Sequence, residues 1–205
     1  FLRIEEIADE TSSDRFGELL AGKWYERLSL GGYTQFRIGE VLGQNGPDLE
    51  VPNDRSVRDN EVFTIRRGRL KVSGDVSERL FIYMQTDFNA SVGGDTSALQ
   101  MRDLYADVSL DAKQEWRLRF GESKVPFGFV NLQSSQNRAP FERPDALNST
   151  VEGERDLGAY LIWAPAETRM VFKDLVKRGL KGSGDYGVAS FGVYAGQGLN
   201  RSDQN

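Results

Sequence analysis

The stretch RRGRLKVSGDVSERLFIYMQTDF, residues 66–88, decides the fold because apolar and polar residues alternate on both sides of a short central turn. Before the turn, Leu70 and Val72 alternate with three cations: Arg67, Arg69 and Lys71. After the turn, apolar residues alternate with polar ones: Leu80, Ile82, Met84 and Phe88 against Arg79, Gln85 and Asp87. Successive side chains of a strand point to opposite faces, so the pattern predicts two antiparallel strands joined at 74–78.

The same alternation recurs in five further segments of the chain: 27–39, 101–110, 115–121, 155–163 and 186–195. The connections between segments alternate in length, with long polar ones at 42–61, 89–98 and 123–153 and short ones at 74–78 and 111–114. Short turns on one edge and long loops on the other are typical of barrels that thread a membrane. The fold class predicted is therefore all-β, an antiparallel up-and-down transmembrane β-barrel of which this chain supplies about seven strands.

One connection breaks this alternation of lengths. Residues 165–185 stand where a short turn is expected, and they contain TRMVFKDLVKRGLKG (168–182). This stretch predicts either a helix at the periplasmic edge or an additional extended piece. At the other end of the chain, residues 1–24 read as a periplasmic N-terminal extension before a barrel portion at 25–205. No signal peptide opens the chain, and the expectation is a chain cut at both ends.

Composition excludes several classes of function. With no cysteine and no histidine among 205 residues, the chain offers no thiolate nucleophile, disulfide or imidazole metal ligand. We therefore expect neither an enzyme nor a bound cofactor. The net charge of -5 argues against a nucleic-acid partner. No apolar run reaches the roughly 18 residues that a membrane-spanning helix needs.

Several segments, taken together and in this order, resemble the phosphate-selective porin O and P family of Gram-negative outer membranes. They are RRGRLKVSG (66–74), MRDLYADVSL (101–110), FGESKVPFGFVNLQSS (120–135), FERPDALN (141–148), RDLGAYL (155–161) and GVYAGQGLN (192–200). The resemblance runs from about residue 28 to residue 200. It implies a homotrimer of 16-stranded barrels in the outer membrane, of which this chain is the N-terminal half. It also implies small anions such as phosphate as solutes, and 123–153 as a constriction loop folded into the pore.

Two groups of residues are candidates for the anion path. The first would line the pore: Arg67, Arg69, Lys71, Arg79, Arg117 and Arg119. Guanidinium and ammonium groups bind phosphate, although pairing with Asp103 or Asp107 on neighbouring strands is an equally open interpretation. The second group lies in the predicted constriction loop: Lys124, Pro126, Phe127, Gly128, Arg138 and Arg143. A solvated surface loop is the alternative for these residues.

The predicted function is a water-filled channel for passive diffusion of small solutes with a preference for anions. A general, weakly selective porin is the first alternative, because aspartates are interleaved with the cations. A soluble β carbohydrate-binding module or glycosidase fragment is the second, motivated by the aromatic content and by acidic pairs such as Glu142 with Asp145. Tryptophans near the predicted strand ends, Trp116 and Trp163 among them, suit either a membrane-interface belt or a soluble core.

Overall fold

A computed structural model describes residues 24–38, 63–88, 99–138, 143, 154–180, 182 and 184–198. The expectations for residues 1–23 and for most of 139–153 lie outside these residues. The elements are η2 (Trp24–Arg27), β1 (Leu28–Ile38), β2 (Phe63–Asp75), β3 (Leu80–Phe88), β4 (Leu99–Ser109), β5 (Trp116–Lys124), α2 (Phe129–Leu132), β6 (Arg155–Trp163), α4 (Ala166–Lys177) and β7 (Ala189–Tyr194).

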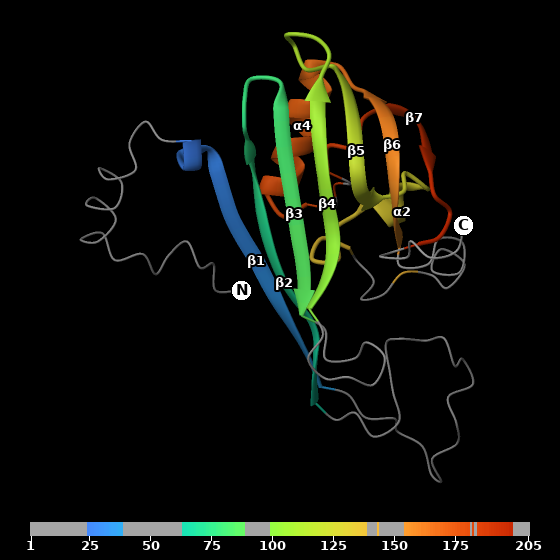
Figure 1. Cartoon of the computed structure of the whole chain (residues 1–205). Helices are drawn as coiled ribbons and strands as arrows, with labels where there is room; N and C mark the ends of the chain where they lie inside the picture. The colour runs from blue at the N-terminus through green and yellow to red at the C-terminus, as the bar shows by residue number, and fades with distance from the viewer. Residues whose placement is uncertain are drawn as a thin grey trace, which may run out of the picture.

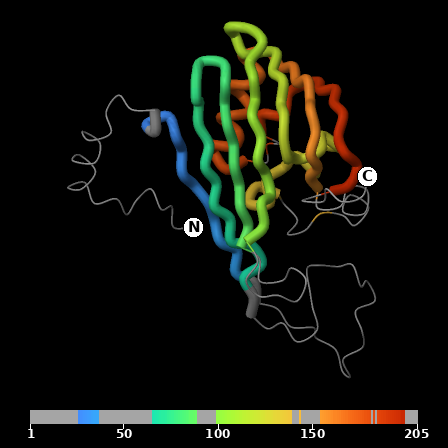
Figure 2. Tube along the Cα trace, in the orientation of Figure 1, coloured from blue at the N-terminus to red at the C-terminus, as the bar shows by residue number. Residues whose placement is uncertain are grey.

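The seven strands form one antiparallel sheet in the order of the sequence, β1 to β7, as Figures 1 and 2 show. The predicted all-β meander is therefore confirmed, and so is the alternation of long connections with the short turns at 76–79 and 110–115. Two strand boundaries differ from the prediction by three residues, and the other boundaries by no more than two. β5 continues to Lys124, and β7 begins at Ala189 instead of 186, because the chain around Tyr186 turns onto one face of the sheet. Arg79 lies in the turn before β3.

The two faces of this sheet have inverted polarity compared with a soluble protein. We call the face that carries Arg69, Asp103 and Arg119 the inner face, and the opposite one the outer face. Large apolar side chains are exposed on the outer face, with Leu157 58 % exposed and Phe191 77 % exposed. On the inner face Asp103 and Arg119 are each 3 % exposed. Among the described residues, the buried hydrophobic ones are only four: Val125, Tyr160, Ile162 and Ala164.

Two segments cover the inner face. Figures 1 and 2 show α4 behind β3 and β4, on the same side of the sheet as α2. The helical alternative for 165–185 is thus confirmed, and α4 lies on the side of the inner face, where Val176 borders the same cavity as Arg69. Pro165 precedes α4, and Gly179, with a φ of 68°, ends it. No helix in the described part of the chain is long and apolar enough to cross a membrane.

Candidate functional site

The three cations of β2 share the inner face but have different partners. Arg67 donates a hydrogen bond to Gln35 Oε1 at 2.5 Å, and Arg69 pairs with Asp87 at 3.0 Å. Within the described residues, the Lys71 ammonium has neither an ion-pair nor a hydrogen-bond partner. Its side chain passes over Gly31, where a Cβ would stand 2.6 Å from Lys71 Cε. Of the three, Lys71 is therefore the cation whose charge is most available to a solute.

The second pair of predicted pore-lining residues lies on β5. Arg119 donates to both oxygens of Asp107, at 2.7 and 2.8 Å, because the register places these residues directly opposite each other. Its guanidinium also lies over the Tyr105 ring, 3.8 Å from the centroid. Arg117 donates to both oxygens of Asp185, at 3.1 and 2.8 Å, and lies 3.7 Å from Asp107. Both arginines are thus fixed by carboxylates.

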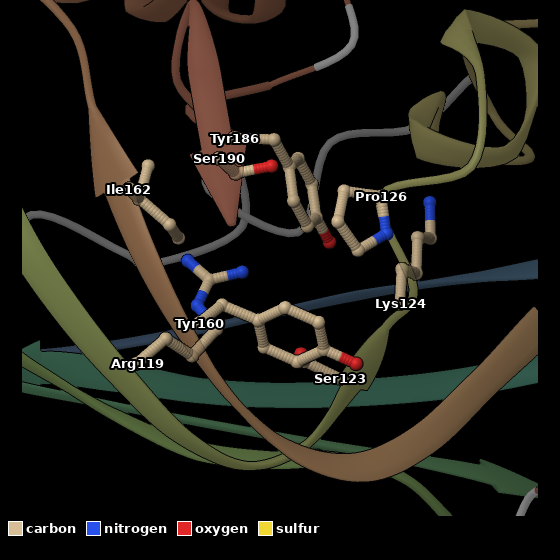
Figure 3. Close-up of a pocket in the computed structure, with 8 residues that line it drawn as sticks. All are labelled: Arg119, Ser123, Lys124, Pro126, Tyr160, Ile162, Tyr186 and Ser190. Carbon is tan, nitrogen blue, oxygen red and sulfur yellow. The ribbon is translucent and has the colours of Figure 1, made fainter. Parts of the chain in front are cut away.

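Figure 3 shows how Arg119 is enclosed. Its guanidinium points toward a space bordered by the rings of Tyr160, on β6, and Tyr186, in the segment before β7. The cavity there measures about 10 Å³, room for about one water molecule. Burial is the largest cause that raises the pKa of Tyr186, to about 12, so its hydroxyl is neutral at pH 7. Tyr186 therefore covers Arg119 without adding a charge.

Arg155 is the most buried cation among the described residues, at 1 % exposed, and was not among the candidates from sequence. It donates through Nε and Nη2 to Asp103 Oδ2, both at 3.0 Å, and through Nη1 to Glu154 at 2.9 Å. The available signal was Asp103 itself, because a carboxylate predicted to lie on a covered face needs a cation nearby. Arg169 and Asp185 were also missed, since their connection had no assigned position, and Tyr186 was missed because it was placed in the strand predicted over 186–195.

The start of the predicted constriction loop packs on the inner face. The Lys124 ammonium donates to the backbone oxygens of Leu132 and Gln133, both at 2.8 Å. Asn131 donates to Val125 O at 2.7 Å, and Arg69 donates to Ser135 Oγ at 3.0 Å. These bonds tie residues 125–138, here called the inner loop, to β2 and β5.

The other candidates of this loop have distinct positions. Gly128, with a φ of 74°, makes the bend that precedes α2, and Pro126 borders the small cavity near Arg119. Phe127 is 47 % exposed, so it does not anchor the loop within the described residues. Arg143 is buried, donates to Asn131 O at 3.1 Å and pairs with Glu154. Arg138 is also buried, whereas Arg79 is exposed in its turn, away from the inner-face cations.

The inner loop, the strand wall and the segment after α4 enclose a cavity of about 220 Å³. Its wall combines cations with tyrosines, chiefly Arg69, Lys71, Tyr33, Tyr83 and Tyr105. Four arginine and lysine side chains line this cavity, Arg69, Lys71, Lys124 and Arg155, and two aspartates, Asp103 and Asp185. The lining therefore has an excess of positive charge, partly neutralised by ion pairs, around a solute-sized space.

Comparisons with known proteins agree with this architecture. Residues 42–205 match the family described as phosphate-selective porin O and P. No curated protein and no solved structure matches the chain. Since the family match covers well over half of the 205 residues, the chain belongs to the phosphate-selective porin O and P family.

Proposed function

We propose that this chain forms part of the wall of an outer-membrane channel through which small solutes diffuse passively, with a preference for anions such as phosphate. Porins are channels and not enzymes. β1 and β7 are the open edges of the described sheet, and open edges are not tolerated in hydrocarbon. Further strands would therefore be needed to close the barrel. As the family resemblance implies, three such barrels would assemble as a homotrimer.

The single observation that carries this proposal is the inverted polarity of the sheet. Leu70, Leu104 and Phe120 are 43–48 % exposed on the outer face, where lipid would cover them. Trp116 and Trp163 form a cross-strand pair beside the short turns, with centroids 6.1 Å apart. Such a position suits an aromatic belt at the membrane interface. A soluble carbohydrate-binding domain would instead expose the charged face to water.

The excess of cations on the inner face supports the anion preference. A positive surface between low-dielectric walls concentrates anions and repels cations. Lys71 contributes more than Arg69, because Arg69 is already neutralised by Asp87. The inner loop would narrow the passage, since it brings Ser135 into contact with both Tyr33 and Arg69 on the wall.

A general, weakly selective porin remains the second candidate, and the ion pairs favour it. Arg69, Arg119 and Arg155 each have an aspartate partner within 3.0 Å. Paired in this way they add little net charge to the passage. The choice between the two candidates depends on how far Lys71 and the remaining cations outweigh the aspartates.

Reversal potentials in planar bilayers test the proposal. The purified full-length protein is measured in a potassium chloride gradient, and we expect chloride to permeate better than potassium. Lys71→Glu should lower the chloride-to-potassium permeability ratio, whereas Lys113→Glu, the same change in an exposed turn, should leave it nearly unchanged. A ratio near one in the unmodified protein would favour the weakly selective channel, and absence of any channel would refute both candidates.

A further inference from the structure

The connection between β6 and β7, described at residues 164–180, 182 and 184–188, differs from the other two described connections on its edge of the sheet. Those at 76–79 and 110–115 are short turns, whereas this one contains α4 and returns along the inner face. Figure 1 shows α4 starting near the short turns and running behind β3 and β4. The connection therefore occupies space that a short turn would leave open.

The beginning of this connection is fixed to the neighbouring turn. The backbone N–H groups of Ala164 and Ala166 donate to Glu115, to its backbone oxygen at 3.0 Å and to Oε1 at 3.1 Å. Arg169 Nη1 donates to Gln114 O at 2.5 Å. Three hydrogen bonds thus hold residues 164–169, which include the first turn of α4, against Gln114 and Glu115.

The end of the connection is fixed to the inner face by Asp185. Its carboxylate accepts two hydrogen bonds from Arg117 and one, at 2.9 Å, from Arg169. The next residue, Tyr186, lies over Arg119 with 5.0 Å between guanidinium and ring centroid. Asp185 therefore neutralises one cation of the strand wall and one of α4, and Tyr186 covers a second cation of the wall.

The same residues border the passage. Val176, Gly182, Gly184 and Asp185 line the cavity of about 220 Å³ together with Arg69 and the other wall residues. The inner loop reaches this cavity from the long-connection edge of the sheet, after the end of β5. The β6–β7 connection reaches it from the short-turn edge.

We propose that the β6–β7 connection is a second restriction of the passage and that Asp185 limits its anion preference by holding Arg117 and Arg169. The inference rests on the proposed channel function. Removing the carboxylate leaves both guanidinium groups charged and loosens the end of the connection. Both effects favour the entry of anions.

Asp185→Asn tests this inference in the full-length protein. At low salt we expect roughly a six-fold rise in the chloride-to-potassium permeability ratio, because one unit charge some 8 Å away in water changes the local concentrations of chloride and of potassium about 2.4-fold each, in opposite directions. Single-channel conductance should rise as well. The control is Glu78→Gln, which removes one negative charge from an exposed turn. A ratio and conductance unchanged in Asp185→Asn would overturn the inference.

A second measurement does not depend on how well Asp185→Asn folds. The chain has no cysteine, so Val176→Cys introduces one thiol into a partly exposed position on the cavity wall. A cationic methanethiosulfonate added to a single open channel should lower its conductance stepwise. The same reagent on Glu78→Cys should have little effect.

Different results would refute the channel function and the second restriction. Open channels whose conductance is insensitive to modification at Val176→Cys would refute the second restriction and leave the channel function intact. A protein that forms no channels in any variant would refute the channel function and, with it, this inference.

Discussion

The outer and inner faces of the same strands differ in chemistry and in how tightly they are packed. On β5, Phe120 is 47 % exposed, while its neighbour Arg119 is 3 % exposed and enclosed by Asp107, Tyr105 and Tyr186. The outer face needs only apolar surface. The inner face needs particular partners, because a buried charge without one is costly. A substitution should therefore cost stability through different mechanisms on the two faces.

The largest effect should come from breaking an inner-face ion pair. Asp107→Asn removes the carboxylate that holds Arg119 and leaves that guanidinium buried without a countercharge. We expect the free energy of unfolding in detergent micelles to fall by about 3–5 kcal/mol. Urea titrations of the full-length protein measure it. An unchanged midpoint would mean that water reaches Arg119 and screens its charge.

A somewhat smaller effect should come from placing a charge on the outer face. Phe120→Arg puts a guanidinium where lipid would lie, at a cost of about 2–4 kcal/mol near the bilayer midplane. Gln136→Arg adds the same charge to an exposed position on the cavity wall and should cost little. The free energies of unfolding of the two variants are compared in lipid vesicles. Equal stability of the two variants would show that a charge costs no more on the outer face than on the cavity wall.

Two glycines differ in how closely the chain packs around them. Gly121 has a φ of 119°, and a Cβ there would stand 2.2 Å from Leu104 O, whereas a Cβ at Gly128 would meet nothing within 4 Å. Both alanine variants carry the strain of a positive φ, of order 1–3 kcal/mol. Only Gly121→Ala adds a collision with the backbone, so its unfolding midpoint should be the lower of the two. Matching midpoints would show that β4 moves to accommodate the methyl group.

The smallest effect on stability should come from Asp111, which lies in a short turn and on neither face of the sheet. The Asp111 carboxylate accepts backbone hydrogen bonds from Trp116 at 2.7 Å and Glu115 at 3.1 Å, and the first of these lowers its pKa most. A carboxyl group with a lowered pKa stabilises the fold above its unfolded pKa of about 3.9, and this contribution is lost as pH falls through the folded value. Between pH 5 and pH 2, the unfolding temperature should fall more in the unmodified protein than in Asp111→Asn.

The sequence by itself determined the strands and their faces. Alternation is a local property with period two, so Leu104 and Asp103 are assigned to opposite faces without knowledge of their neighbours. The alternation of long and short connections likewise indicated that neighbouring strands run antiparallel in the order of the sequence. These features required no contact between distant residues, and the structure confirms them.

Ion-pair partners depended on register, which only the tertiary structure decided. Arg69 lies opposite Asp87, and Arg119 lies opposite Asp107. Arg69 therefore pairs with Asp87, whereas Asp103 pairs with Arg155 and Asp107 with Arg119, unlike the sequence-based alternative in which Asp103 or Asp107 would neutralise this β2 cation. Register shifts at Gln35/Phe36 and Gln85/Thr86 move the pairing by one residue within two ladders. Alternation alone does not locate such irregularities.

The position of α4 was likewise decided by tertiary contacts. Residues 168–182 allowed a helix, but the side on which it lies follows from Arg117, Arg169 and Asp185, which are brought together from β5, α4 and the segment after it. Asp185 lies 68 residues from Arg117 in the sequence. A contact over such a separation forms only when the sheet has placed both ends, because neither residue carries a local signal for its partner.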